Sequence, residues 1–174
     1  MSVRVALVTV LLAAGCRSHK PAATHSKPVP AGDTAAMCAD LDRWVTDSAG
    51  NFAAERTARP VEVGDHVGVD AQATIAGTQH CVILHPDPDY PEDMAECDVS
   101  SPAPIDDTRA LLEAWIPRVG SCAAVTGWFE RPHNDGAHSW DDEIDDDHLL
   151  EVTLGIKGDH KESRLVLQIK RPEL

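Results

Sequence analysis

Two stretches of the chain repeat apolar residues with a period of about 3.6, which predicts two amphipathic helices. The predicted helices span 34–56 and 105–119. Asp33 or Thr34 is expected to cap the first helix and Asp106 the second, because short polar side chains accept hydrogen bonds from the first N–H groups. Proline lacks an N–H and clashes with the preceding turn, so Pro117 is expected to kink the second helix or end it near Trp115.

Alternating or short apolar runs elsewhere predict strands. The predicted strands are 66–75, 79–84, 95–99, 124–130, 149–157 and 164–170. On the first of them, the side expected to be buried carries Val67, Val69, Ala71, Ala73 and Ile75. Three prolines and four acids make 85–93 a loop, and the polar stretch 133–148 is also predicted to be a loop.

The last two predicted strands have the clearest alternation in the chain. If they pair as a hairpin, their apolar sides share one face when Ile156 lies opposite Leu165 and Leu154 lies opposite Leu167. That register leaves two or four residues for the turn. The order of elements is helix, strands, helix, strands. The sequence therefore predicts an α+β domain, an antiparallel sheet with two helices packed on one face.

A targeting segment precedes this domain. Residues 1–4 carry one positive charge, and 5–14 are apolar, far fewer than the roughly 20 residues that span a bilayer. Residues 12–16 (LAAGC) resemble the lipobox of bacterial lipoproteins, in which the cysteine becomes the lipid-modified N-terminus. The resemblance implies a signal peptide, 1–15, and lipidation of Cys16. An ordinary secretory signal cut nearby is the alternative.

The resemblance also implies a location in the bacterial cell envelope. In lipoproteins, an Asp directly after the lipidated cysteine retains the protein in the inner membrane, and this chain has Arg17 there. The chain is therefore expected to be held on the outer membrane by its acyl anchor. Residues 16–32, rich in Pro, Ala, Ser and Lys, are expected to form a flexible linker to a single domain, 33–174.

The domain is strongly acidic. Residues 33–174 contain 11 basic and 29 acidic residues, in a chain with a formal net charge of −14. This charge repels phosphate groups and argues against a nucleic-acid partner. The hydrophobic share of 43% is ordinary for a globular domain, so the acidity does not imply disorder.

Apart from the lipidated cysteine, the chain has four cysteines, an even number that suggests two disulfides in an exported protein. The predicted turn in 85–93 places Cys81 opposite Cys97. Elimination then pairs Cys38 with Cys122, which requires the start of the first helix to lie near the end of the second. No cysteine is left over for a catalytic thiol, and no CxxC spacing is present.

Residues 141–147 hold six carboxylates in seven positions, and histidines lie nearby. Carboxylates could bind a hard cation such as calcium, and imidazoles with a carboxylate could bind zinc or copper. The candidate ligands are His133, Asp135, His138, Asp141, Asp145 and His148. The order of an EF-hand, a helical HxxxH pair and a Cys/His quartet are all absent from the sequence. A solvated loop with surface histidines is therefore the favoured interpretation, and no cofactor is expected.

Three aromatic residues flank the acidic stretch. Trp128 and Phe129 are adjacent, so on a strand one of them should point outward, and the other could fill the core. Trp140 lies among polar residues and is expected to be partly exposed. Exposed tryptophans are common in binding patches, so Trp128 and Trp140 are candidate binding residues.

Three functions fit these features. No GxSxG elbow, glycine-rich phosphate loop or GxGxxG motif is present, so the leading hypothesis is a non-enzymatic binding or accessory lipoprotein with an envelope protein partner. Its contact surface is expected within 128–148. The second hypothesis is a divalent cation-binding module using 133–148. The third is an inhibitor or immunity protein that neutralises a basic envelope enzyme through its acidic surface.

Overall fold

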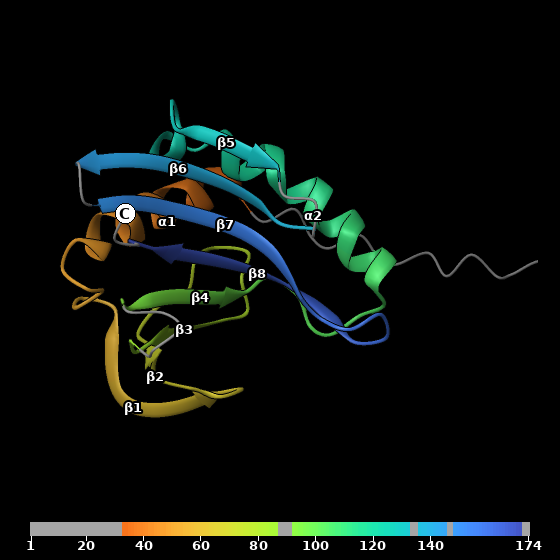
Figure 1. Ribbon diagram of the computed structural model, residues 1–174, viewed down its shortest axis with the longest axis horizontal. Helices are drawn as coiled ribbons and strands as arrows, with labels where there is room; N and C mark the ends of the chain where they lie inside the picture. The colour runs from red at the N-terminus through yellow and green to blue at the C-terminus, as the bar shows by residue number, and fades with distance from the viewer. Residues whose placement is uncertain (1–32, 87–91, 133–135, 146–147, 172–174) are drawn as a thin grey trace, which may run out of the picture.

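The computed structural model describes residues 33–86, 92–132, 136–145 and 148–171. Within these residues the chain forms two α-helices, one 3₁₀ helix and eight strands (Figure 1). In chain order they are α1 (Thr34–Ser48), β1 (Arg56–Val63), β2 (His66–Ala71), β3 (His80–Leu84), β4 (Met94–Asp98), α2 (Ile105–Gly120), η1 (Ala123–Val125), β5 (Phe129–Pro132), β6 (His138–Asp145), β7 (His148–Gly158) and β8 (Ser163–Lys170). None of the helices in the described ranges is long and apolar enough to cross a membrane.

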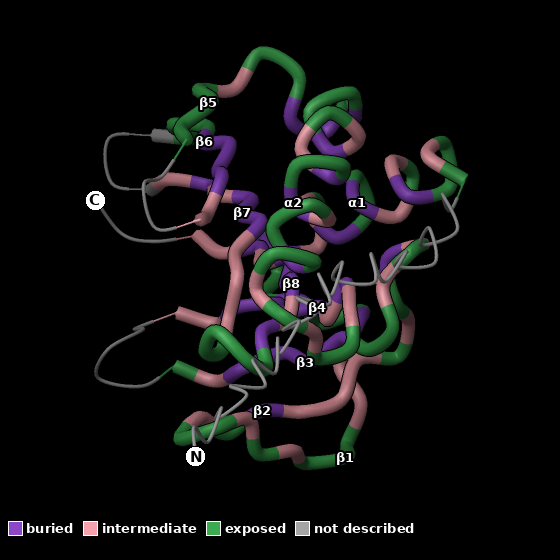
Figure 2. The backbone as a smooth tube through the Cα atoms, turned by 90° about the vertical axis from the view of Figure 1, so that its right-hand side faces the viewer, coloured by how far each residue is buried: buried purple, intermediate pink, exposed green. Residues whose placement is uncertain are grey.

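All eight strands belong to one antiparallel sheet, in the order β1-β2-β3-β4-β8-β7-β6-β5. Each half of the chain contributes a helix followed by four consecutive strands, and the last strands of the two halves, β4 and β8, pair at the centre of the sheet. Both helices pack on one face, where Figure 2 draws them side by side. The predicted α+β class, with two helices on one face of an antiparallel sheet, is confirmed.

The main hydrophobic core lies between the helices and the sheet face that they cover, which we call the covered face. The helices contribute Met37, Leu41, Trp44, Leu112, Trp115 and Val119 to it. The central strands contribute Ile83, Ala95, Val152, Leu154, Leu165, Leu167 and Ile169. Full burial of each large apolar side chain stabilises the fold by about 1.5–3 kcal/mol relative to exposure, so this layer is the main source of stability.

The C-terminal hairpin has the predicted register. Ile156 lies opposite Leu165, and Leu154 lies opposite Leu167. Three of these side chains are buried, and Ile156 packs against the same core. The strands leave residues 159–162 for the turn, one of the two predicted lengths.

The first helix begins as predicted, with the Asp33 carboxylate accepting a hydrogen bond from the Ala35 N–H at 3.0 Å. It ends at Ser48, well before the predicted end. Phe52 has a φ of 56°, in the left-handed region, and its buried ring lies 6.0 Å from that of Trp44. The turn that brings Phe52 back to the core therefore replaces the last predicted helical turns.

The second helix departs from the prediction at both ends. Its N-cap is Pro104, with Asp106 in the first turn rather than at the cap. The helix also continues past Pro117 instead of ending near Trp115. Trp115 and Val119, on either side of the proline, are both buried. Because the proline removes only one hydrogen bond close to the helix end, this burial outweighs its cost.

Two predictions for residues 124–148 are wrong. The predicted strand 124–130 is the 3₁₀ helix η1 followed by β5, and the predicted loop 133–148 contains all of β6. β6 lies between β5 and β7 and pairs with both. Pairing on two sides satisfies its backbone groups, which compensates for a sequence with low strand propensity.

The first half of the sheet also differs from the expected pattern. The predicted strand 66–75 ends at Ala71, and Val67, expected on the buried side, is 56% exposed. The pattern misses β1, because Pro60 and the charged residues of this strand conceal any alternation. β1 is an edge strand, where proline is tolerated.

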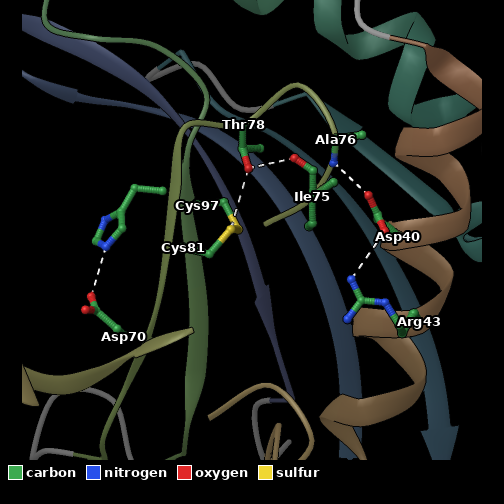
Figure 3. The surroundings of a disulfide bond; sticks show 9 residues. Asp40, Arg43, Asp70, Ile75, Ala76, Thr78, Cys81 and Cys97 are labelled. Carbon is green, nitrogen blue, oxygen red and sulfur yellow. Dashed lines mark hydrogen bonds and ion pairs between the residues drawn. A yellow bond between two sulfur atoms is a disulfide. The ribbon is translucent and has the colours of Figure 1, made fainter. Parts of the chain in front are cut away.

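Both predicted disulfides are present. Cys81 and Cys97 are direct partners in the register of β3 and β4, with Cα atoms 4.0 Å apart. Figure 3 shows this bond and Thr78, whose Oγ1 lies 3.6 Å from the Cys81 sulfur. Cys38 and Cys122, with Cα atoms 4.9 Å apart, join the start of α1 to the residue that precedes η1. The two helices therefore run as the second pairing requires.

Candidate functional site

Trp140, one of the two predicted binding residues, is buried. Its side chain is 3% exposed, and its ring lies 4.7 Å from that of His138 on the covered side of β6. Gly120 of α2 faces the indole, since a Cβ added there would lie 3.5 Å from the Trp140 Nε1. The prediction of partial exposure is wrong because the polar neighbours, Ser139 and Asp141, point to the opposite side of the strand. Trp140 is therefore a core residue.

The other two aromatic residues divide as expected between the core and the surface. Trp128 is partly buried against the main core. Phe129 is 67% exposed, the largest fraction among the large hydrophobic side chains that the structure describes. It lies on β5, the last strand of the sheet, opposite Asp141 of β6. Phe129, rather than Trp140, is the aromatic residue of this region that is available to a partner.

Two of the six candidate metal ligands, His138 and Asp141, point to opposite faces of the sheet. The His138 Nε2 lies 2.7 Å from Glu130 Oε1 on the covered side. On the other side, the Arg131 Nε lies 2.7 Å from Asp141 Oδ2, which is almost fully buried. An odd number of positions separates the two residues on one strand, so they do not converge on one ion.

The other four candidate ligands add no described cluster. His133 and Asp135 lie outside the described residues. Asp145 and His148 are backbone partners where β6 meets β7, but their side chains also fall outside the description. Within the part of the chain that the structure describes, no group of three or more His, Cys, Asp or Glu side chains could hold a metal ion.

A second feature, which the sequence does not predict, lies on the sheet face opposite the helices. We call this face the open face. The β1–β2 hairpin folds over this face. Residues of β1 thereby reach β3 and β4, although β2 lies between β1 and β3 in the sheet. A small apolar cluster forms there from Val61, Val63, Val82, Leu84 and Met94. Gly68 allows this close approach, because a Cβ at that position would lie 2.3 Å from the carbonyl oxygen of Ile83.

The folded hairpin and the open face enclose a groove of about 260 Å³, which we call the hairpin groove. Its lining residues are Glu62, Val63, Gly64, His80, Val82, Glu96, Asp98 and Arg164. They come from the hairpin, from β3 and β4, and from the start of β8. Residues of both halves of the chain therefore build one concave site.

The hairpin groove is organised around a buried carboxylate. Glu96 is 2% exposed, although it lies on the open face. The Lys157 ammonium contacts its carboxylate, the Gln168 amide donates a hydrogen bond to it at 2.8 Å, and the Arg164 guanidinium lies 3.5 Å away. Arg164 also pairs with Asp98 at 3.1 Å. These contacts compensate for the burial of the Glu96 charge and hold Arg164 in place.

The sequence contains one sign of this arrangement. β4 reads Met94-Ala-Glu-Cys-Asp98, so acidic residues alternate with residues of the covered face. This alternation indicates a polar face on a central strand. The partners of those acids come from β7 and β8, more than fifty positions away in the chain, and only the fold brings them together.

No protein-family model matches the chain, and no curated protein or solved structure is similar enough to it to count as a match.

Proposed function

We propose that this chain is a lipid-anchored, non-enzymatic binding protein of the bacterial cell envelope, and that it captures a basic protein partner. The lipobox-like residues 12–16 support the anchor on the outer membrane. The two disulfides support an oxidising compartment outside the cytosol, because reducing systems keep cytosolic cysteines as thiols.

The observation that carries the binding role is the exposure of Phe129 at one edge of the sheet. We call this region the β5–β6 edge, residues 128–132 and 138–144. β5 pairs with β6 on one side and, among the residues that the structure describes, has no neighbouring strand on the other. An exposed aromatic side chain supplies a large apolar contact, and an edge strand can pair with an extended segment of a partner.

The charge of this edge favours a basic partner. Asp142 and Glu143 on β6 are exposed, and Ile144 beside them is 40% exposed. The one Arg or Lys among the residues of the β5–β6 edge, Arg131, is paired with Asp141. Together with the excess of 29 acidic over 11 basic residues in 33–174, this arrangement favours fast association with a positively charged protein.

Affinity capture from envelope membranes of the native host tests the proposal. The lipidated full chain is compared with Phe129→Ser, at low and at raised salt. The matched control is Val67→Ser, which removes another exposed hydrophobic side chain on β2, in the other half of the sheet.

The expected result is one abundant basic protein that Phe129→Ser captures at least about tenfold less well, while Val67→Ser captures it as the unchanged chain does. Capture should also fall as salt rises, because steering by charge is screened. Equal capture by both variants would remove the β5–β6 edge as the contact surface. An unprocessed, unlipidated N-terminus in the native host would contradict the proposed anchor.

A further inference from the structure

The exposed ring of Phe129 has an exposed carboxylate beside it on the same face of the sheet. Phe129 is the direct register partner of Asp141, and Glu143 is two positions further along β6. The pairing of β6 with β7 is regular through Glu143 and shifts only beyond it. Side chains two positions apart on a strand point to one face, so Phe129 and Glu143 both project from the open face. Diagonal neighbours of this kind lie about 7–8 Å apart, a spacing that one planar group can bridge.

The other charged groups of the open face near this ring already have partners. The Arg131 guanidinium, on the far side of the ring from Glu143, pairs with Asp141. The Glu151 carboxylate on β7 lies 3.2 Å from the Lys170 ammonium. Glu143 is exposed, and the described part of the chain gives it no ion-pair partner. One negative charge beside the ring is therefore unbalanced, and an added cation would be attracted to it.

The ring can be reached from the end of β5 that lies nearer to Glu143. β5 is the outermost strand on this side of the sheet (Figure 1). Gly127, two positions before Phe129, has no side chain, and a Cβ built there would meet no atom within 4 Å. A side chain of a partner can therefore approach the ring and the carboxylate together.

A guanidinium group matches this combination better than other groups do. It is planar and weakly hydrated, so it stacks on an aromatic face, and its forked donors match the two oxygens of a carboxylate. An ammonium group is compact and strongly hydrated, and it does not stack. An uncharged apolar side chain would use the ring but not the charge.

We propose that Phe129 and Glu143 form a subsite for an arginine side chain of the partner, with the guanidinium stacked on the ring and paired with the carboxylate. The inference rests on the proposed function, because it names the side chain by which the basic partner is held at the β5–β6 edge.

NMR titration of the full chain tests the subsite with N-acetyl-arginine methylamide. The corresponding citrulline probe has the same shape without the charge, and the lysine probe keeps the charge without the planar fork. The test variants are Phe129→Leu, which keeps an apolar side chain, and Glu143→Gln. The matched control is Asp142→Asn, which removes an equal charge at the adjacent exposed residue, whose side chain points to the covered side. The amide signal of Gly127 reports the location of binding.

We expect the arginine probe to shift the Gly127 signal saturably, and the citrulline and lysine probes to bind at least about threefold more weakly. Phe129→Leu and Glu143→Gln should each weaken binding of the arginine probe about threefold or more, and Asp142→Asn by less than about 1.5-fold. Equal binding of the citrulline or lysine probe, equal losses in Glu143→Gln and Asp142→Asn, or an unshifted Gly127 signal would overturn the subsite.

Affinity capture of the basic partner separates this inference from the proposed function. If Phe129→Ser loses the partner while Glu143→Gln and Asp142→Asn capture it equally well, the edge binds the partner but the arginine subsite is wrong. If Phe129→Ser captures the partner as the unchanged chain does, the proposed contact surface is wrong, and the subsite falls with it even when the probe binds.

Discussion

The two faces of the sheet are closed in different ways. The covered face is sealed by two helices over aliphatic and aromatic side chains, whereas the open face is partly closed by the β1–β2 hairpin and by ion pairs. β8 displays the contrast within one strand. Leu165, Leu167 and Ile169 point to the covered face, and Arg164, Gln168 and Lys170 point to the open face.

Because of this difference, the covered face contributes mainly to the stability of the fold, and the open face mainly to the specific geometry of a site. Apolar burial on the covered face depends on area and tolerates many side chains of similar volume. The contacts of Glu96 on the open face depend on particular donors at particular distances, so a change there alters a site more than it alters the fold. Four measurements test how far the two faces differ in their contribution to stability.

The largest expected effect concerns the two disulfides, whose cysteines belong to the core of the covered face. Replacing Cys38 and Cys122 by alanine should cost about 4–5 kcal/mol of unfolding free energy, and replacing Cys81 and Cys97 about 3 kcal/mol. The bonds span 84 and 16 positions, and the longer loop gains more entropy in the unfolded chain when released. Guanidinium denaturation without reductant measures both losses. An equal or reversed order would contradict the loop-entropy argument.

The next prediction compares two adjacent residues that lie on opposite faces of β8. Leu167→Ala should lower the unfolding free energy by about 2–5 kcal/mol, because it leaves a cavity in the main core. Gln168→Ala should lower it by about 1 kcal/mol, since it removes one hydrogen bond to Glu96. Urea denaturation of the two variants provides a matched pair. Equal losses would mean that the open face contributes as much stability as the covered face.

A smaller effect is expected at the buried carboxylate of the open face. Glu96→Gln should cost about 1 kcal/mol at low salt, because its partners Lys157 and Arg164 are 40% and 33% exposed and therefore well screened. The loss should shrink as salt rises. Glu62→Gln, which breaks no described ion pair, is the control and should leave stability unchanged. A salt-independent loss in Glu96→Gln would point to packing rather than charge.

The smallest effect concerns the turn between β7 and β8. The N–H groups of Glu162 and Lys161 donate to the Asp159 carboxylate and hold its pKa below the usual range. A lowered pKa means that this group stabilises the fold above its ordinary pKa, and that the contribution is lost as pH falls through the folded value. NMR titration should give Asp159 a lower midpoint in the folded chain than in a peptide of the same turn. Equal midpoints would contradict the turn geometry.

Features set by local patterns were predictable from the sequence. The alternation in residues 149–157 and 164–170 predicts both strands and their register, because a shift of one residue would expose every apolar side chain. The disulfide pairing follows from the hairpin that places Cys81 opposite Cys97. Asp33 caps α1 as its position before the helix predicts.

The errors share one cause, which is burial in a core that the local pattern does not predict. Trp140 lies among polar residues, yet the covered side of β6 buries it against α2. Phe52 ends α1 early by returning to the core, and Val119 keeps α2 intact beyond Pro117. In each case burial in the core outweighs a local preference worth about 1–3 kcal/mol.

The sequence alone was sufficient for the α+β class, the antiparallel sheet, the two helices on one face and the cysteine pairs, because these depend on periodicity and on neighbours along the chain. Only the tertiary structure decided that Phe129 is exposed, that β6 is a strand, and that the hairpin groove exists. Glu62, Glu96 and Arg164 are far apart in the chain, and their meeting depends on how far the β1–β2 hairpin folds over the sheet. The folding of the hairpin over the sheet depends on the close approach of the Gly68 backbone to β3, which the local sequence pattern does not predict.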